Sequence, residues 1–377
     1  MEGDFIKINK WLYPLSALYG IGVGLRNQLF DWNILPSRSF DIPVISIGNI
    51  TVGGTGKTPH TEYLINLLKK EWKVAVLSRG YKRKSHGFQL ASPDTPMQMI
   101  GDEPFQMKQK FPDIYVAVDA NRCRGIDNLC KEEIAPGTEV VLLDDAYQHR
   151  YVNPGINILL VDYHRLICYD TLLPAGRLRE PEIEKHRANI VIVTKCPRDI
   201  KPMDYRVIYK QMSLYPYQKL YFSTLTYGKL VPLASSEDDK KKRSLDSIAK
   251  DEKILLVTGI ASPQQLLLDL KKYCQQIETL TYPDHHTFSP KDIATIRKRF
   301  EQMGEGKKII ITTEKDATRL INHPQLDEEL KKHIYQLPIE IEILQNQQES
   351  FNNNIIGYVR KNPRNSILSK GPNTHRP

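Results

Sequence analysis

Residues 44–59 read VISIGNITVGGTGKTP, a β-branched apolar run followed by a glycine-rich loop and the start of a helical pattern. The loop is close to the Walker A motif, in which glycines let backbone N–H groups surround phosphate oxygens. Lys57 and Thr58 would add a charge and a hydroxyl for Mg²⁺, and the following helix would add its dipole. The first glycine of the motif is replaced by Thr51. We therefore expect a nucleoside triphosphate site made of Thr51, Gly53, Gly54, Thr55, Gly56, Lys57 and Thr58.

Apolar strands and helical stretches alternate after this loop. Helical periodicity covers residues 61–70, and the strands are predicted at 74–77, 115–118, 140–143, 156–161 and 190–193. This alternation is typical of a P-loop NTPase-like α/β fold with a doubly wound, mostly parallel sheet. In such sheets, binding sites form at the carboxyl ends of the strands.

The charged loop at residues 235–244, SSEDDKKKRS, lies near a predicted domain junction. Beyond it, strands near 254–257 and 308–312 and helices at 263–272 and 290–302 predict a second, smaller α/β domain. Residues 339–343, IEIEI, alternate as an exposed antiparallel strand does, and could pair with the strand at 220–225 as a two-stranded linker. The expected parts are an N-terminal segment (1–35), a P-loop core (36–217), the smaller domain with the linker strands (218–348), and a C-terminal helix with a basic disordered tail (349–377).

About half of the net charge of +9 comes from basic residues in the C-terminal tail, which has no acid after Glu349. A solvated tail and contact with an anionic surface both account for this charge, and no nucleic-acid partner is expected. The five cysteines are scattered without metal-ligand spacing. Their odd number argues against a disulfide framework and favours a reducing cytoplasm.

Residues 11–25 contain no charged side chain and are rich in apolar ones, with Lys7, Lys10 and Arg26 on their flanks. The segment is too short to cross a bilayer, and no cleavage site follows that would make it a signal peptide. It fits a helix that lies in the membrane interface. A core helix packed on the first domain fits it equally.

Two acidic pairs could act at the phosphate site. The strand Val140–Leu143 ends in Asp144 and Asp145, the form of a Walker B strand whose acid reaches Mg²⁺. Gly101-Asp102-Glu103-Pro104 begins a helical segment, where acids complement the helix dipole. Alternatively, Asp102 or Glu103 could be the base that phosphoryl transfer needs.

Three further stretches carry polar side chains. Residues 173–181, LPAGRLREP, present Arg177 and Arg179, which suit phosphate but could be ordinary surface arginines. Residues 282–288, YPDHHTF, could supply one imidazole that acts with a carboxylate across a cleft, whereas zinc is disfavoured because no third ligand has suitable spacing. Residues 310–316, IITTEKD, end a strand at a ligand edge or a helix cap.

Taken in order, the motifs GNITVGGTGKTP, SRGY, GDEP, DDAYQH, LPAGRLREP, DHHTF and TEKD resemble those of the tetraacyldisaccharide 4′-kinase family of lipid A biosynthesis. The resemblance runs from about residue 10 to about residue 345. Members of that family resemble this chain in having Ser or Thr where the first Walker glycine belongs. The departures are modest: Ala146-Tyr147 replaces an expected Gly-Phe, and His286 replaces a familiar aromatic residue.

The resemblance implies a transferase that moves the γ-phosphate of ATP to the 4′-hydroxyl of a tetraacylated glucosamine disaccharide 1-phosphate. It implies that Lys57 and Thr58 bind ATP phosphates and Mg²⁺, that Asp144, Asp145 or both hold the metal, and that Asp102 is the general base. It also implies that His285 closes from the second domain to orient or tune that base. The supporting residues implied with less detail are Glu103, Arg177, Arg179, Glu314 and Asp316, the last two near the nucleoside.

Because an acylated substrate lies in the bilayer, the resemblance favours the interpretation of residues 1–35 as a membrane-associated segment, with a monotopic helix from about Trp11 to Phe30. The implied location is the cytoplasmic face of the inner membrane of a Gram-negative-type bacterium, with no obligate protein partner. Two alternatives remain. A membrane-recruited regulatory P-loop ATPase would have a lysine directly before Gly53, where this chain has Val52. A soluble small-molecule or nucleoside kinase would leave residues 11–25 as core.

Overall fold

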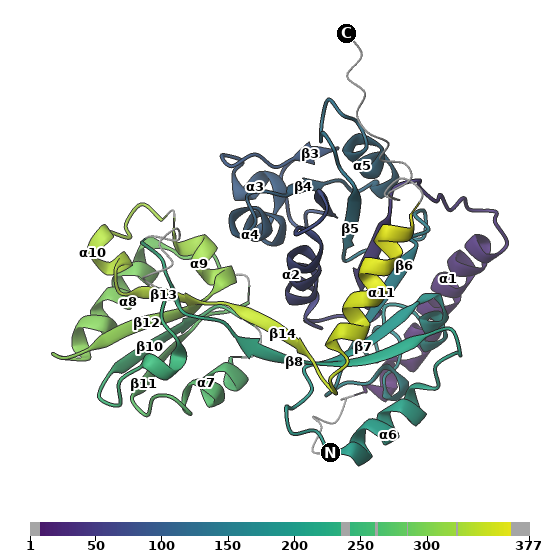
Figure 1. Cartoon of the computed structure of the whole chain (residues 1–377). Helices are drawn as coiled ribbons and strands as arrows, with labels where there is room; N and C mark the ends of the chain where they lie inside the picture. The colour runs from purple at the N-terminus through teal and green to yellow at the C-terminus, as the bar shows by residue number, and fades with distance from the viewer. Residues whose placement is uncertain (1–7, 235–241, 261–262, 285, 322, 363–377) are drawn as a thin grey trace, which may run out of the picture. The chain divides into compact units, whose positions relative to one another are not determined.

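The computed structural model describes residues 8–234, 242–260, 263–284, 286–321 and 323–362. The chain forms two compact units, unit 1 (residues 1–225 and 341–377) and unit 2 (residues 226–340), which Figure 1 shows with their helices and strands labelled. His285 and residues 363–377 of the predicted basic tail lie outside the described residues.

Unit 1 is built on a nine-stranded sheet in the order β14-β8-β7-β6-β1-β5-β2-β4-β3. The strands are β1 (Val44–Gly48), β2 (Val74–Ser78), β3 (Gln89–Leu90), β4 (Tyr115–Val118), β5 (Val140–Asp144), β6 (Ile156–Asp162), β7 (Ile190–Thr194), β8 (Lys219–Tyr227) and β14 (Ile339–Ile343). Every pair from β8 to β4 is parallel, and β3 pairs antiparallel with β4. The predicted fold class, a doubly wound and mostly parallel sheet, is confirmed.

Helices cover both faces of this sheet because its central strands are apolar on both sides. One face packs against α2 (Lys57–Leu68), α4 (Asp102–Lys110) and α11 (Gln348–Lys361). The other face packs against α5 (Arg122–Leu129) and α6 (Pro202–Met212). The short elements of this unit are η1 (Lys10–Leu12), α3 (Met97–Ile100), η2 (Ile167–Tyr169) and η3 (Glu182–Arg187).

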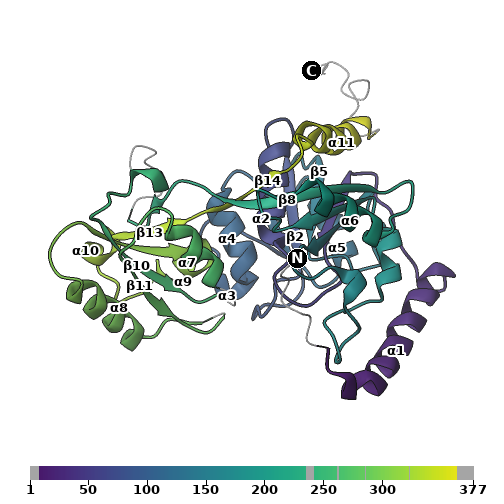
Figure 2. The same ribbon diagram turned by 90° about the horizontal axis from the view of Figure 1, so that it is seen from below.

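Helix α1 (Tyr13–Asp31) runs along the outside of unit 1, as Figure 2 shows from below. One side of the helix is attached through polar groups: the Ser16 hydroxyl donates to the Leu172 carbonyl at 3.0 Å, and the Tyr19 hydroxyl donates to the Arg179 carbonyl at 2.9 Å. Its large apolar side chains Leu15, Leu18, Ile21 and Leu25 are exposed, as is Trp11 in the preceding η1. Across the described part of the chain, no helix has the length and apolar character needed to span a bilayer.

Unit 2 has a five-stranded sheet in the order β11-β10-β12-β13-β9. Its strands are β9 (Val231–Pro232), β10 (Lys253–Thr258), β11 (Ile277–Thr281), β12 (Lys308–Thr313) and β13 (Ile334–Leu337), all parallel except β9. The helical elements are η5 (Leu245–Ser247), α7 (Gln264–Leu270), α8 (Pro290–Gln302), α9 (Glu314–Leu320) and α10 (Glu328–Lys331). The predicted second α/β fold is therefore present.

Strands β8 and β14 are neighbours at the edge of the large sheet, and the unit boundaries fall within both of them. The Leu344 N–H donates to the Phe222 carbonyl at 2.8 Å, and the Gly228 N–H donates to the Pro338 carbonyl at 3.0 Å. One residue number rises as the other falls, so the pair is antiparallel. This is the two-stranded linker that the alternating IEIEI pattern predicts.

Candidate functional site

The glycine-rich loop connects the buried strand β1 to helix α2, which begins at Lys57. Gly53 and Gly56 have φ values of +109° and +83°, a region that L side chains rarely adopt. These two residues curl the loop, while helix α2 directs its first N–H groups toward the space that the loop encloses. The geometry is that of an anion site at the carboxyl end of a central strand.

Thr51 is extended and pairs with Leu178 in an antiparallel β-bridge. The bridge is framed by hydrogen bonds from the Val52 N–H to the Arg177 carbonyl at 2.8 Å and from the Arg179 N–H to the Ile50 carbonyl at 2.7 Å. Thr51 is buried and needs no left-handed conformation. The loop 173–181 thus supports the phosphate loop, and this pairing explains why position 51 does not require glycine.

Asp144 ends β5 beside the phosphate loop, since it pairs in register with Ile47 of β1. Its Oδ1 accepts a hydrogen bond from the Thr61 hydroxyl at 3.1 Å, and its buried Oδ2 has no hydrogen-bond partner among the described residues. Burial, then the nearby charges of Glu103 and Asp145, raise the pKa of Asp144 to about 7. A buried carboxylate that has one oxygen without a hydrogen-bond partner among the described residues, with other acids nearby, is suited to bind a cation.

Asp145 follows with a left-handed φ of +46° and turns its carboxylate toward two cations. Its Oδ1 lies 3.6 Å from Lys57 Nζ and 3.2 Å from Arg179 Nη2. Burial opposes ionisation of Asp145, but the charges of Lys57 and Arg179 outweigh it and lower the pKa. Arg179 also donates to the carbonyl of Asn49, at 3.2 Å. Of the two predicted arginines, only Arg179 turns its side chain to this site, while Arg177 is exposed and contributes its carbonyl.

Asp102 and Glu103 form the first turn of α4. The turn lies against the SRGY segment: a Cβ on Gly101 would lie 2.9 Å from the Tyr81 carbonyl, and one on Gly80 would lie 2.9 Å from the Ile100 carbonyl. Because Glu103 raises the pKa of Asp144, the acidic pair of α4 lies close to the end of β5. The structure therefore brings the GDEP and DDAYQH motifs to one edge of the sheet.

Two groups of residues at this edge are absent from the sequence prediction. Arg122, the first residue of α5, is buried, and its Nε has no hydrogen-bond partner among the described residues. Burial and the charge of Arg79 lower its pKa to about 10, while Asp145 and Asp144 attract it. Thr194, the last residue of β7, and Lys195, which follows it, bond to the phosphate loop. In the sequence, the feature that could have identified Thr194 and Lys195 is their position directly after the predicted strand at 190–193.

The motif residues of unit 2 are organised around the carboxyl ends of its own strands. Asp316 accepts hydrogen bonds from the Gly259 N–H at 2.8 Å and the Thr313 hydroxyl at 2.7 Å. Glu314 accepts a hydrogen bond from the Ile339 N–H at 3.3 Å. Both predicted acids thus hold backbone segments of unit 2 in place.

The described residues of the DHHTF motif are also held within unit 2. Asp284 lies 3.5 Å from Lys315 Nζ, and His286 Nε2 lies 3.0 Å from Asp292. The His286 ring stacks on Tyr282 with centroids 4.8 Å apart. No group of three or more His, Cys, Asp or Glu residues has the arrangement of a metal site in the described parts of the chain.

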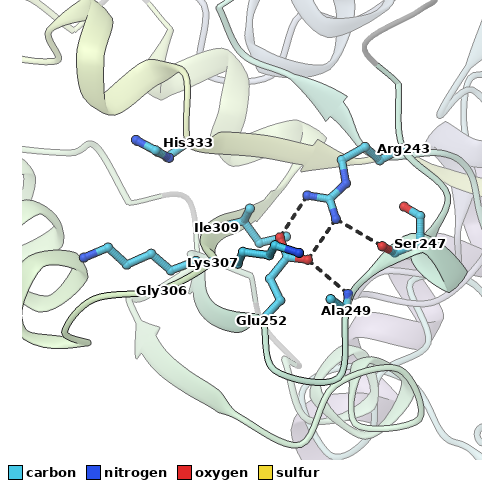
Figure 3. Close-up of a pocket in the computed structure, with 9 residues that line it drawn as sticks. Arg243, Ser247, Ala249, Glu252, Gly306, Lys307, Ile309 and His333 are labelled. Carbon is cyan, nitrogen blue, oxygen red and sulfur yellow. Dashed lines mark hydrogen bonds and ion pairs between the residues drawn. The ribbon is translucent and has the colours of Figure 1, made fainter.

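A pocket of about 460 Å³ lies at the amino ends of β10 and β12 in unit 2 (Figure 3). Arg243 donates two hydrogen bonds of 2.9 Å to Glu252 there, so its charge is already neutralised. The pocket lies at the ends of these strands opposite to the carboxyl ends, where binding sites in parallel sheets usually form.

Comparisons with known proteins agree on one family. The family model described as tetraacyldisaccharide-1-P 4′-kinase matches residues 8–359. The tetraacyldisaccharide 4′-kinase of Phocaeicola vulgatus is 69% identical over 98% of this chain and 100% of its own length. That of Bacteroides thetaiotaomicron is 60% identical over 100% of both chains. The crystal structure of the "apo" form of LpxK from Aquifex aeolicus in complex with ATP matches with a TM-score of 0.70 and 28% identity, over 92% of this chain and 98% of that one.

Proposed function

The chain belongs to the tetraacyldisaccharide-1-P 4′-kinase family, and we propose that its phosphate loop binds the ATP from which the lipid A precursor is phosphorylated. The enzyme transfers the γ-phosphate of ATP to the 4′-hydroxyl of a tetraacylated glucosamine disaccharide 1-phosphate. The observation that supports the site best is the convergence of Lys57, Asp145 and Arg179 beside the buried Asp144. In this proposal Lys57 and the N–H groups of residues 53–57 hold the phosphates.

Mg²⁺ fits the acidic side of this site. Asp144 Oδ2 is buried without a hydrogen-bond partner among the described residues, and Thr58 lies in the first turn of α2. Mg²⁺ usually takes one or two carboxylates together with phosphate oxygens, and it would neutralise charge on the phosphates. Asp144 and the Thr58 hydroxyl would hold the ion, with Asp145 as the second candidate carboxylate.

Asp102 is proposed as the general base. Its carboxylate would accept the proton of the 4′-hydroxyl while that oxygen forms its bond to the γ-phosphorus, and the bond from the γ-phosphorus to the bridging oxygen of ADP breaks. Lys57, Arg179 and Arg122 would stabilise the negative charge around the transferred group. His285 has the tuning role that the family resemblance implies, and it lies outside the described residues.

The surface of α1 supports a membrane-associated enzyme. An exposed apolar stripe on a helix whose other side is bonded to the core is typical of helices that lie in the bilayer interface. Such a helix would hold the phosphate loop at the membrane surface, where the sugar headgroup of an acylated substrate lies. The proposed location is the cytoplasmic face of the inner membrane.

A lipid kinase assay tests the proposal. Purified protein with Mg-ATP and detergent-dispersed disaccharide 1-phosphate should yield the bis-phosphorylated product. Lys57→Ala should abolish the reaction, whereas Lys70→Ala, which removes an exposed lysine just after the same helix, should not. Phosphorylation of a water-soluble sugar or nucleoside instead of the lipid would favour the soluble small-molecule kinase.

A further inference from the structure

Three consecutive carbonyl groups of the phosphate loop accept hydrogen bonds from side chains outside the loop. The donors are Lys195 Nζ for Gly54, Thr194 Oγ1 for Thr55 at 2.9 Å, and His60 Nδ1 for Gly56 at 2.7 Å. Two of the donors come from the end of β7 and one from the first turns of α2. We call Thr194, Lys195 and His60 the carbonyl anchors.

The anchors fix the direction of the N–H groups. In a planar trans peptide the C=O and the N–H of the next residue point in opposite directions. Anchoring the carbonyls of residues 54, 55 and 56 therefore turns the N–H groups of Thr55, Gly56 and Lys57 away from the anchors. A run of N–H groups that converge in this way is a phosphate-binding nest. We propose that the carbonyl anchors are positioning residues that hold this nest ready for ATP.

Lys195 and Thr194 are themselves fixed. Lys195 Nζ also donates to Asp162 Oδ2 at 2.7 Å, and Lys195 has a left-handed φ of +58°, which is uncommon outside glycine, asparagine and aspartate. Such conformations persist where the surroundings enforce them, often at functional sites. Thr194 is fully buried, and its hydroxyl is closer to the Thr55 carbonyl of the loop, at 2.9 Å, than to the Val161 carbonyl, at 3.3 Å.

His60 is held in one tautomer. A carbonyl oxygen can only accept, so Nδ1 carries the proton that is donated to Gly56, and Nε2 accepts from the Ser223 hydroxyl at 2.9 Å. Ser223 lies in β8, the strand that continues into unit 2. His60 therefore ties the phosphate loop to the linker strand through two defined hydrogen bonds.

Thr194→Val tests the anchors without changing charge. It removes one hydroxyl and keeps the shape of the side chain, so the affinity for ATP should fall about tenfold, the usual effect of one lost hydrogen bond. The KM for ATP should rise while the KM for the lipid is unchanged, and Thr194→Ser should restore the wild-type KM for ATP. Thr138→Val is the matched control, because the buried Thr138 hydroxyl donates to the Ala135 carbonyl at 2.8 Å away from the loop.

Two further variants, Lys195→Met and Asp162→Asn, distinguish a positioning role of Lys195 from direct electrostatic attraction between its charge and the phosphates. If Lys195 acted as a free cation on the phosphates, Asp162→Asn would remove the neutralising carboxylate and tighten ATP binding. Positioning predicts weaker ATP binding in both Lys195→Met and Asp162→Asn. Tighter binding in Asp162→Asn, or wild-type affinity in Thr194→Val, would overturn the inference.

The inference rests on the proposed function, because it assigns the nest to ATP. ATP binding measured by calorimetry in the absence of lipid distinguishes a failure of the proposed function from a failure of the anchor proposal. A wild-type enzyme that binds ATP but ignores the lipid would refute the lipid kinase and leave the anchors standing. A Thr194→Val enzyme with unchanged ATP affinity would refute the anchors and leave the kinase standing.

Discussion

Thr51 and Leu178 form an antiparallel β-bridge that joins the start of the phosphate loop to the loop 173–181. The same loop receives hydrogen bonds from α1, since the Ser16 hydroxyl and the Tyr19 hydroxyl bond to its carbonyls or to those beside it. One segment of backbone therefore connects the surface helix to the nucleotide site. A substitution at position 51 acts on this connection rather than on phosphate contacts alone.

Replacing Thr51 by glycine should weaken the protein, although it restores the Walker A consensus. Glycine loses more backbone entropy on folding and removes the side chain that accepts from Asn49 at 3.4 Å, so the free energy of unfolding should fall by about 1 kcal/mol. Thermal or denaturant unfolding measures the change. Gly22→Ala is a useful control, because a Cβ at this position of α1 would meet no atom within 4 Å and the loss of a helical glycine should raise the free energy of unfolding. An increase in stability of Thr51→Gly would contradict the role of the bridge.

Removing the proposed base should separate turnover from nucleotide binding. Asp102→Asn keeps the shape of the side chain but cannot accept the hydroxyl proton, so kcat should fall by about 10²-fold or more while the affinity for ATP persists. Steady-state kinetics and calorimetry provide the two values. Asp94→Asn removes an exposed carboxylate in the same unit and should have wild-type kinetics. Unchanged turnover in Asp102→Asn would remove this residue from the mechanism.

Charges on α1 should detach the enzyme from membranes. Leu18 and Ile21 are 66% and 67% exposed, so Leu18→Asp with Ile21→Asp should leave the melting temperature unchanged. Co-sedimentation with anionic vesicles should fall at least about tenfold, because two apolar side chains lose their burial in the interface. Leu268→Asp, a change at a 57% exposed leucine of α7, is the matched control. Equal sedimentation of all three proteins would show that α1 does not bind lipid.

Two histidines, the buried His60 and the half-buried His149, should make the protein sensitive to mild acid. Burial lowers the pKa of His60 to about 4, and partial burial together with the charges of Arg122, Arg26 and Arg79 lowers the pKa of His149 to about 4. Between pH 6.5 and 4 the unfolded chain binds protons that the folded chain does not, so the free energy of unfolding falls as the pH falls through this window. His60 alone could account for about 3 kcal/mol.

Denaturant unfolding at several pH values measures this dependence. His60→Asn should be less stable than the wild type at neutral pH but should show a flatter decline below pH 6.5. His164→Asn, at an exposed histidine, should keep the wild-type slope. A wild-type slope in His60→Asn would show that this imidazole is not the acid-sensitive group.

Local pattern in the sequence was enough to predict the central architecture. The β-branched run, the glycines and the helical periodicity of residues 44–68 specify a strand, a loop and a helix, because each depends on near neighbours. The strands at 115–118 and 190–193 and the helix at 290–302 were predicted for the same reason. Asp144 could be placed at the phosphate site because parallel strands bring their carboxyl ends to one edge.

What the sequence could not supply are contacts between segments far apart in the chain. The pairing of Thr51 with Leu178, the burial of Arg122 and the anchoring of the Gly54 carbonyl by Lys195 carry no local signature. They depend on the strand order β7-β6-β1-β5, which places the ends of sequence-distant strands beside the phosphate loop. The sequence by itself determined the nucleotide-binding loop and its family. Only the tertiary structure decided which side chains hold that loop in shape, because those hydrogen bonds exist only once the sheet has assembled.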